Sequence, residues 1–380
     1  MPEFYEFFAG AGMVRAGLGD GWRCLFANDF DHKKSRVYEE NWGLGALKTA
    51  DVGTLTVCDL PGVPGLTWAS FPCQDLSLAG GGAGLRGDRS GTFWPFWKLM
   101  KGLIVDNRAP GMVVLENVCG TLTSHDGKDF VAICDALEGG QYKLGALVIN
   151  ADLFVPQSRP RLFVIAVRSD LRLPTGVASP MAVDPWHTKT LQGAYERLPK
   201  RIKASWIWWN PPTPATRTTT LADIIEDDPA DVKWFTAIET KQLLAMMSTV
   251  NAAKVTAAKM RRTRVVGTIY KRTRRDGDGR KVQRAEVRFD DISGCLRTPA
   301  GGSSRQVILV VEGQSVRARL ISSRETARLM GLPDAYKLPS NYNEAYHLTG
   351  DGVVVPVVQH LAQHLFEPIF GANEVSTAAA

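Results

Sequence analysis

A chain of 380 residues is long enough for two domains, and a hydrophobic share of 44% excludes a disordered protein. No apolar run approaches the length of a membrane span and the N-terminus lacks a positively charged leader, so we expect a soluble cytoplasmic protein. The six cysteines form no Cys-x-x-Cys pair, which argues against a zinc site or a disulfide framework and fits a reducing compartment.

Charge is distributed unevenly along the chain, although the net charge is only +6. Between Lys254 and Arg288 there are 13 lysines and arginines against three acids, so this segment carries +10 and the remainder carries −4. A polyanionic partner is the natural interpretation of such a polycation. A charged face that is merely solvated is the alternative.

The chain begins with a strand, a glycine turn and a helix. Residues 3–8 are expected to form the strand, Ala9 to Gly12 the turn, and residues 13–18 the start of the helix. Glycines let a ligand approach the backbone, and a helix start presents free N–H groups. Arg15 stands at the place of the third glycine, so the turn is not the full dinucleotide fingerprint.

Acidic residues follow the next two expected strands. The second strand, residues 22–27, leads into Asn28-Asp29-Phe30, and an acid at this place can accept hydrogen bonds from ribose hydroxyls. Phe30 is placed to stack on an adenine. After a helix, Asp51 and Val52 end the third strand.

Cys73 lies between an expected strand and a glycine-rich loop. Residues 65–70 form an apolar run typical of a buried strand, and residues 75–91 contain too many glycines for regular structure. In open α/β sheets, ligands bind at the carboxyl ends of strands. A thiol fixed there by Pro72, before a loop that can close, is a candidate nucleophile. A buried free cysteine is the alternative.

Further polar groups are expected at strand ends downstream. The next elements are a helix, a strand, a helix and two strands, over residues 92–106, 112–115, 130–137, 144–149 and 161–167. Glu116, Asn117 and Val118 follow the first of these strands, so Glu116 and Cys73 are expected across one crevice. Arg159 and Arg161 lead into the last strand, where alternate spacing puts both on one face. A surface salt bridge is the alternative role for either arginine.

The pattern changes after residue 170, where frequent prolines mark an expected domain boundary. The segment to about residue 295 is irregular, basic and bears tryptophans. Within it, residues 265–270 and 282–289 alternate like strands around the turn Asp276 to Gly279, which predicts a basic hairpin. The chain ends with an expected strand over 307–311, a helix over 322–330 capped by Ser322 or Ser323 with Glu325, and a helix over 357–366.

The stretch Phe71-Pro-Cys-Gln-Asp-Leu-Ser77 resembles the nucleophile motif of the DNA (cytosine-5) methyltransferases. Three other stretches resemble motifs of that family in the same order: Phe7 to Met13, Glu116 to Val118, and Gln157 to Phe163. The resemblance continues through Arg297 to Gly302 and the region of Gly350, and it leaves out about residues 170–290. Each motif alone is weak, but the ordered set is highly specific.

The resemblance implies an α/β fold with a Rossmann-like S-adenosylmethionine-dependent methyltransferase domain and a smaller, irregular, β-containing target-recognition domain. The catalytic domain would span residues 1–170 and continue in 312–380, and the target-recognition domain would span 171–311. The implied activity is methylation of carbon 5 of cytosine in a specific sequence of double-stranded DNA, with S-adenosylmethionine as cofactor and no metal. A monomer is expected, and a restriction endonuclease acting on the same site is a candidate partner.

The resemblance also implies roles for individual residues. Cys73 would add to carbon 6 of a flipped-out cytosine, and Glu116 would bind ring N3 and the exocyclic amine. Arg161 would hold the carbonyl oxygen and Arg159 would support the site. The implied cofactor residues are Phe8, Ala9, Gly10, Gly12, Met13, Asp29, Phe30, Asp51, Val52, Pro72, Phe93, Asp351 and Val353. Those at the target base are Phe71, Asn117 and Val118, and those on DNA are Lys271, Arg272, Arg274, Arg275, Arg280 and Lys281.

Two positions depart from the family pattern. Met13 stands where the family often has glycine, and Asp351 follows Gly350 where Gly-Asn is usual, which leaves the role of Asp351 open. An RNA cytosine-5 methyltransferase is the main alternative, but that subgroup usually has a second proline at the place of Phe71 and lacks a long insert. A non-catalytic DNA-binding relative is the other alternative, against which the retention of Cys73, Glu116 and both arginines argues.

Overall fold

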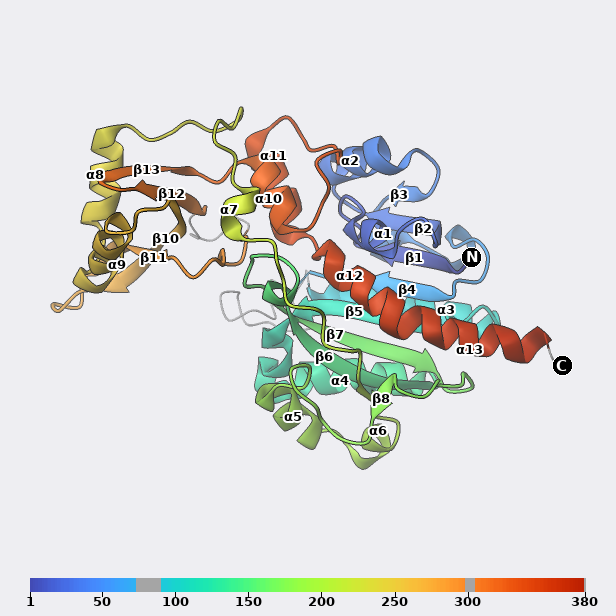
Figure 1. Ribbon diagram of the computed structural model, residues 1–380. Coiled ribbons are helices and arrows are strands. Elements are labelled where there is room, and N and C mark those ends of the chain that lie inside the picture. Colours follow the sequence, from blue (N-terminus) through green and yellow to red (C-terminus); the bar gives the residue numbers. More distant parts are fainter. Residues whose placement is uncertain (73–89, 298–304, 379–380) are drawn as a thin grey trace. The chain divides into compact units, whose positions relative to one another are not determined.

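The structure, a computed structural model, describes residues 1–72, 90–297 and 305–378, which form two compact units. Unit 1 comprises Met1–Asn150, Pro160–Ala215 and Val353–Ala380, and unit 2 comprises Ala151–Arg159 and Thr216–Gly352. Each unit has its own sheet and its own hydrophobic core (Figure 1). Cys73 and the greater part of the predicted loop at 75–91 lie outside the described residues.

Unit 1 is built on a seven-stranded sheet with the order β3-β2-β1-β4-β5-β7-β6. Its strands are β1 (Glu3–Phe7), β2 (Arg23–Asp29), β3 (Leu47–Thr49), β4 (Leu66–Ala69), β5 (Met112–Val118), β6 (Tyr142–Asn150) and β7 (Pro160–Arg168). Neighbouring strands from β3 to β5 pair in parallel, whereas β7 is antiparallel to both β5 and β6. The strand order reverses between β1 and β4, which is the place where doubly wound sheets bind ligands.

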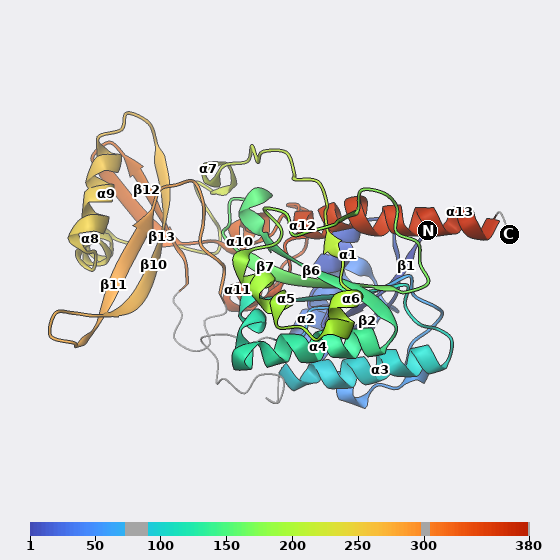
Figure 2. The same cartoon turned by 90° about the horizontal axis from the view of Figure 1, so that it is seen from below.

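Helices cover both faces of this sheet, as Figures 1 and 2 show. One face carries α1 (Met13–Leu18), α12 (Val355–Leu361), a π-helical turn (Ala362–Phe366) and α13 (Glu367–Ala378), and the other carries α3 (Phe93–Val105) and α4 (Lys128–Gly139). α2 (His32–Trp42) packs beside β2 and β3. Because both faces are covered, the strands read as continuous apolar runs. On α3, Phe93, Phe96, Met100 and Leu103 recur at helical spacing and are fully buried.

The domain boundary expected near residue 170 does not coincide with the boundary between the two compact units. Residues 160–215 pack within unit 1, where β8 (Ala178–Ser179) pairs with β9 (Trp208–Trp209) and α5 (Lys189–Glu196) and α6 (Lys200–Ala204) lie between them in sequence. The division falls instead after Ala215 and after Gly352. Which residues form the functional target-recognition domain stays a prediction.

The segment after residue 170 packs within unit 1 although it is rich in proline. The buried indole of Trp186 donates from Nε1 to the carbonyl of Pro211 at 2.8 Å, and the imidazole Nε2 of His360 on α12 lies 2.9 Å from the carbonyl of Pro212. Proline removes a backbone donor but keeps its carbonyl acceptor. Prolines therefore interrupt regular elements here without ending the compact unit.

Unit 2 is organised by an antiparallel sheet with the order β11-β10-β12-β13. Its elements are β10 (Val265–Arg275), β11 (Lys281–Arg288), β12 (Val307–Glu312), β13 (Ser315–Leu320), α7 (Leu221–Ile224), α8 (Ala237–Ala245), α9 (Thr249–Lys259), α10 (Ser323–Leu329) and α11 (Tyr342–Asp351). The core joins α8 and α9 to one face of the sheet. The predicted basic hairpin is confirmed, since β10 and β11 pair up to Arg275 and Lys281, and Asp276 Oδ1 accepts from the N–H groups of Asp278 and Arg280.

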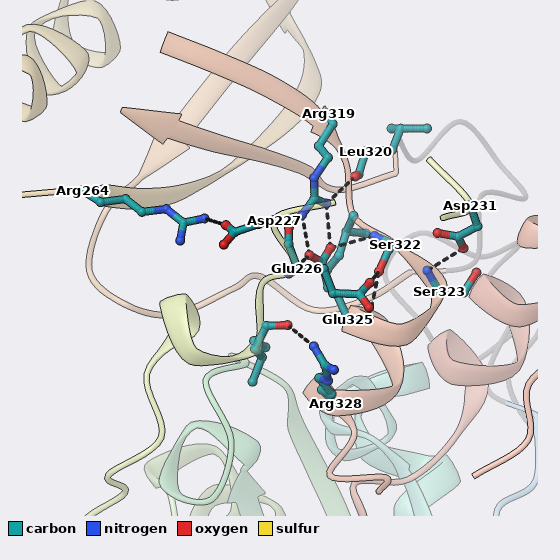
Figure 3. A network of polar contacts seen from close by, with 12 residues as sticks. Glu226, Asp227, Asp231, Arg264, Arg319, Leu320, Ser322, Ser323, Glu325 and Arg328 are labelled. Atoms are coloured by element: carbon teal, nitrogen blue, oxygen red, sulfur yellow. Dashed lines mark hydrogen bonds and ion pairs between the residues drawn. The ribbon is translucent and has the colours of Figure 1, made fainter. Parts of the chain in front are cut away.

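A buried ion pair joins β13 to α10 within unit 2 (Figure 3). The side chains of Arg319 and Glu325 both have 0% exposure, and the guanidinium donates to the two carboxylate oxygens at 2.8 and 2.5 Å. Arg319 also donates to the carbonyl of Glu226, whose carboxylate accepts from the hydroxyl of Ser322. Ser322 and Glu325 form the predicted capping box of α10. The pairing of Glu325 with Arg319 was not predicted from the sequence.

Across the described chain, no helix combines the length and the apolar character that crossing a membrane requires.

Candidate active site

The predicted site residues of unit 1 gather at the carboxyl edge of its sheet. The glycine turn follows β1, Asp29 ends β2, Phe71 and Pro72 follow β4, and Glu116 to Val118 end β5. Because β7 runs in the opposite direction, its first residues, including Arg161, lie at the same edge, where Arg161 pairs in register with Val118 and Ile149. One edge therefore carries groups from five strands, on both sides of the point where the strand order reverses.

The turn after β1 has a backbone that requires glycine. Gly10 and Gly12 have φ of 56° and 82°, and Phe8 also adopts a positive φ of 57°. A Cβ on Gly12 would lie 2.3 Å from Nε1 of Trp42 on α2, which donates to the carbonyl of Ala11 at 3.0 Å. The chain is thus held in a tight left-handed turn that only glycine can form at position 12.

Glu6 is a residue at this turn that the sequence analysis missed. It lies in β1, is 1% exposed, and accepts from the backbone N–H of Val14 at 3.3 Å. The N-cap residue of α1 is Gly12, which has no side chain to cap the helix, so Glu6 supplies an acceptor to its first turn. Burial raises the pKa of Glu6 to about 8. The available signal was an acid inside an otherwise apolar strand.

Asp29 links the end of β2 to the glycine turn. Its Oδ2 accepts from the N–H of Gly10 and its Oδ1 from the N–H of Asp31, both at 2.8 Å. The residue is 6% exposed, and burial raises the pKa of its carboxyl. A carboxylate offers about four acceptor positions, so the two used here leave others for hydroxyl donors. Phe30, which follows, is 68% exposed and offers a free ring face.

The remaining predicted cofactor residues of unit 1 have different settings. Ala9, Met13, Val52 and Phe93 are buried, and Pro72 is half-buried. Asp51 begins a short 3-10 helix, where its Oδ1 accepts from the N–H of Gly53 at 2.7 Å. Val353 is buried at the start of the C-terminal part of unit 1. Asp351 is exposed at the end of α11 in unit 2.

Glu116 and Arg161 form an ion pair at the edge of the sheet. Arg161 Nε lies 3.2 Å from Glu116 Oε1, and the side chains are only 17% and 8% exposed. Asn117 donates from its side-chain amide to the carbonyl of Phe71 at 3.2 Å, while its Oδ1 accepts from the N–H of Val118 at 2.8 Å. Asn117 therefore holds the chain immediately before Pro72 against the end of β5, two residues ahead of Cys73.

Arg159 has a different setting from Arg161. It belongs to unit 2, is 2% exposed, and donates to the carbonyls of Leu296, Gly350 and Gly352 at 3.1, 2.8 and 2.8 Å. β7 begins at Pro160, so Arg159 precedes the strand and the expectation that both arginines share one strand face does not apply. Its hydrogen bonds therefore join the segment at Leu296 to the segment at Gly350 and Gly352, both in unit 2.

Most of the predicted DNA-contacting cations on the hairpin of unit 2 are exposed, but several are paired. Arg272 Nε lies 3.4 Å from a carboxylate oxygen of Glu286, and Arg274 Nη2 lies 2.5 Å from the other. Arg275 donates to the carbonyl of Gly279 at 2.9 Å, within the turn. The other predicted DNA-contacting residues are Lys271, half-buried, and Arg280 and Lys281, both exposed.

In the described parts of the chain, no group of three or more His, Cys, Asp or Glu side chains could hold a metal ion. Cys119 follows Val118, and burial raises the pKa of its thiol. Cys73 itself lies outside the described residues.

Comparison with known proteins identifies the family of the chain. A family model described as C-5 cytosine-specific DNA methylase matches residues 3–367. The type II methyltransferase M.HhaI of Haemophilus parahaemolyticus is 25% identical over 96% of this chain and 94% of its own. M.HpaII of Haemophilus parainfluenzae is 24% identical over 96% and 89%.

Solved structures show the same fold at lower identity. The Dnmt2 methyltransferase of S. pombe superposes with a TM-score of 0.57 at 16% identity, covering 97% of this chain and 99% of its own. A putative DNA modification methyltransferase encoded within an E. coli prophage gives 0.57 at 15%, covering 98% and 100%. The predicted fold class is therefore confirmed.

Proposed function

The chain belongs to the C-5 cytosine-specific DNA methylase family and is an S-adenosylmethionine-dependent DNA (cytosine-5) methyltransferase, and we propose that it acts on a cytosine flipped out of duplex DNA through a covalent adduct with Cys73. The observation that carries this proposal is the buried Glu116–Arg161 pair, 3.2 Å apart, which joins β7 to the end of β5, where Asn117 holds Phe71. We assign the nucleophile to Cys73, two residues beyond Phe71 in the sequence, because this chemistry needs an acid and a cation beside the target base.

Carbon 5 of cytosine is a poor nucleophile, so the ring has to be activated. In the proposed reaction the Cys73 thiolate bonds to carbon 6 while Glu116 binds ring N3 and the exocyclic amine. Arg161 holds the carbonyl oxygen, and its bond to Glu116 fixes the carboxylate for this contact. Carbon 5 then accepts the methyl group and loses its proton, and elimination of the thiolate restores the aromatic ring.

The residues at the edge fit S-adenosylmethionine. Asp29 keeps acceptor positions for ribose hydroxyls, and the exposed ring of Phe30 can stack on adenine. When bound, the cofactor supplies an electrophilic methyl group. The protein's own part is to bind and orient it, through the turn, Asp29 and Phe30, and to hold the cytosine.

Double-stranded DNA is the proposed substrate, with the basic hairpin of unit 2 as a contact surface. RNA is not favoured, because the family model and the type II relatives are DNA methyltransferases. A restriction endonuclease with the same recognition sequence is the proposed biological partner, and a monomer is the proposed active form.

Trapping of the adduct tests the proposal. Duplexes with 5-fluorocytosine in the methylated sequence are incubated with the protein and S-adenosylmethionine, because fluorine at carbon 5 blocks the final elimination. A denaturation-resistant complex is expected with the wild type and with Cys58→Ala, which alters an exposed thiol, and none with Cys73→Ala. A complex that persists in Cys73→Ala but disappears in Cys119→Ala would move the nucleophile to Cys119.

A further inference from the structure

Two adjoining hollows lie where α9 meets β11 in unit 2. One, of ≈ 300 Å³, is lined by Lys254, Ala257, Ala258, Arg261, Arg288, Phe289 and Asp290. The other, of ≈ 260 Å³, shares Lys254 and Arg288 with the first and extends along the hairpin to Tyr270 and Arg272. We call the part around Lys254, Arg261 and Arg288 the α9–β11 groove. A recessed surface lined by cations focuses positive potential more strongly than an open face does.

The groove is fixed because α9 covers the free edge of β11. β11 is the terminal strand of its sheet, and the backbone of Val287 points outward. Asn251 Oδ1 accepts from the N–H of Val287 at 3.0 Å, and Lys254 Nζ donates to its carbonyl at 3.2 Å. One of the three ammonium donors of Lys254 is thus used to hold the side chain in place. The other two remain for an oxygen-rich ligand.

Neighbouring acids neutralise only part of the charge in the groove. Arg288 pairs with Asp290, with Nη2 2.5 Å from Oδ2, so these two cancel. Within the described residues, Arg261 has no ion-pair partner, and the described contact of the Lys254 ammonium is to a carbonyl oxygen. The groove therefore keeps about two positive charges. On the hairpin, by comparison, Arg272 and Arg274 share Glu286.

We propose that the α9–β11 groove binds a phosphate of the DNA backbone, and that Lys254 and Arg261 make this contact. The proposal rests on DNA being the substrate. A phosphodiester fits because it carries the opposite charge and accepts hydrogen bonds from both an ammonium and a guanidinium. Such a contact carries no sequence information; it positions the duplex while the hairpin remains available for base edges.

Two pairs of neutral substitutions test this contact. The double variant Lys254→Gln/Arg261→Gln removes the groove charge, and glutamine keeps a donor for the carbonyl of Val287. The control, Lys259→Gln/Arg262→Gln, changes two nearby cations, one at the end of α9 and one just beyond it, that do not line either hollow. Arg261→Gln alone serves as a second test, because Arg261 is exposed and we expect its replacement to leave the fold unaffected.

Binding of a duplex is measured across several salt concentrations by fluorescence anisotropy. The slope of log affinity against log salt is expected to flatten by roughly 0.9 for the groove double variant, which no longer neutralises this phosphate, and by up to that amount for Arg261→Gln. The control double variant is expected to flatten less than half as much. Affinity should fall equally for duplexes with and without the recognition sequence.

The outcomes separate this inference from the proposed function. If the wild type binds no duplex, the proposed function fails. If the wild type binds and the groove and control variants give equal slopes, the function stands and the groove contact is refuted. If polyglutamate, but not duplex DNA, binds the wild type more tightly than the groove variant, the groove serves an acidic protein segment and the inference is overturned.

Discussion

The carboxyl edge of unit 1 and the basic segment of unit 2 both depend on charge, but they hold it differently. At the edge the paired charges of Glu116 and Arg161 are largely buried, at 8% and 17% exposure. In the basic segment there are many charged groups, and a typical pair, Glu286 with Arg274, is 29% and 49% exposed. An exposed pair contributes about 0.2–1 kcal/mol, whereas a buried charge deprived of its partner costs several. The size of the effect of replacing a charged residue should therefore depend more on how deeply the charge is buried than on how many charges lie around it.

The largest effect is expected where charge is most completely buried, at Arg319 and Glu325 with 0% exposure each. Arg319→Met should lower the free energy of unfolding by about 3–5 kcal/mol, because Glu325 would keep a buried charge without its cation. The control is Arg317→Met: Arg317 also lies over the ring of Trp234 but is exposed. Urea unfolding of both variants is the measurement.

A second variant distinguishes charge from packing at this pair. Arg319→Met/Glu325→Gln removes both charges and should recover part of the stability that Arg319→Met forfeits. If the double variant is as unstable as Arg319→Met, packing rather than the unpaired carboxylate explains the destabilisation. Burial of charge would then not account for the largest expected effect.

The next effect is expected at Glu116. Glu116→Gln keeps the size of the side chain but removes the charge that faces Arg161, and turnover should fall on the order of 100-fold or more, within the range of general acid–base catalysis. The affinity for S-adenosylmethionine, measured by calorimetry, should change little, because Glu116 ends β5 and the glycine turn follows β1. Normal turnover together with a large drop in cofactor affinity would show that Glu116 serves cofactor binding and not the chemical step.

Asp29 should show the reverse pattern. Asp29→Ala removes the acceptor of the Gly10 and Asp31 N–H groups as well as the proposed ribose contact, and a charged hydrogen bond is worth about 1.5–3 kcal/mol. The Michaelis constant for S-adenosylmethionine should rise by roughly tenfold or more, while duplex binding stays intact. Asp29→Asn can still accept one of the two backbone hydrogen bonds, so its Michaelis constant should lie between those of the wild type and Asp29→Ala. An unchanged cofactor dependence would remove Asp29 from the site.

The edge of unit 1 could be predicted because parallel strands end together, so residues that follow apolar runs converge whatever the loops do. The sequence therefore located Asp29, Phe71 and Glu116. It could not predict the Glu116–Arg161 bond, because that bond depends on β7 running against β5. Nor could it predict the setting of Arg159, since alternation applies only inside a strand and β7 starts one residue later. Glu6 was not predicted as a site residue, because strands were identified from runs of apolar residues and a buried acid does not fit that pattern.

The basic segment could be predicted as a hairpin and as a polycation, but not as a set of free charges. Its turn residues fix the fold locally, and composition gives the charge. Which cation pairs with Glu286 depends on cross-strand register, with Tyr270 opposite Glu286, and on side-chain direction. The place of Lys254 and Arg261 beside β11 depends on how α9 packs on the sheet edge, which a local sequence pattern does not encode.

The smallest effect is expected on the hairpin. Neutralising Lys271, Arg272, Arg274 and Arg275 together should weaken binding to all duplexes and flatten the salt slope by roughly 0.9 for each phosphate that the protein no longer neutralises. Because Arg272 and Arg274 already share Glu286, we expect these four residues to neutralise fewer than four phosphates, and the slope to change by about 2 or less. Cofactor binding should survive, since the predicted cofactor edge belongs to unit 1. An unchanged slope would mean that this charge is only solvated.

A change of opposite sign at the same place sharpens the comparison further. Glu286→Gln removes the acid that Arg272 and Arg274 share, at 3.4 and 2.5 Å, and frees both guanidiniums. Because the acid is 29% exposed, its removal should change the free energy of unfolding by less than about 1 kcal/mol.

Duplex affinity should rise and the salt slope should steepen, since two more cations can then release counterions. Binding titrations at several salt concentrations measure both, with Glu312→Gln as the control, an acid at the end of β12 that lies 3.6 Å from Arg264. Weaker binding in Glu286→Gln than in the control would show that the carboxylate orients the arginines toward DNA instead of withholding them.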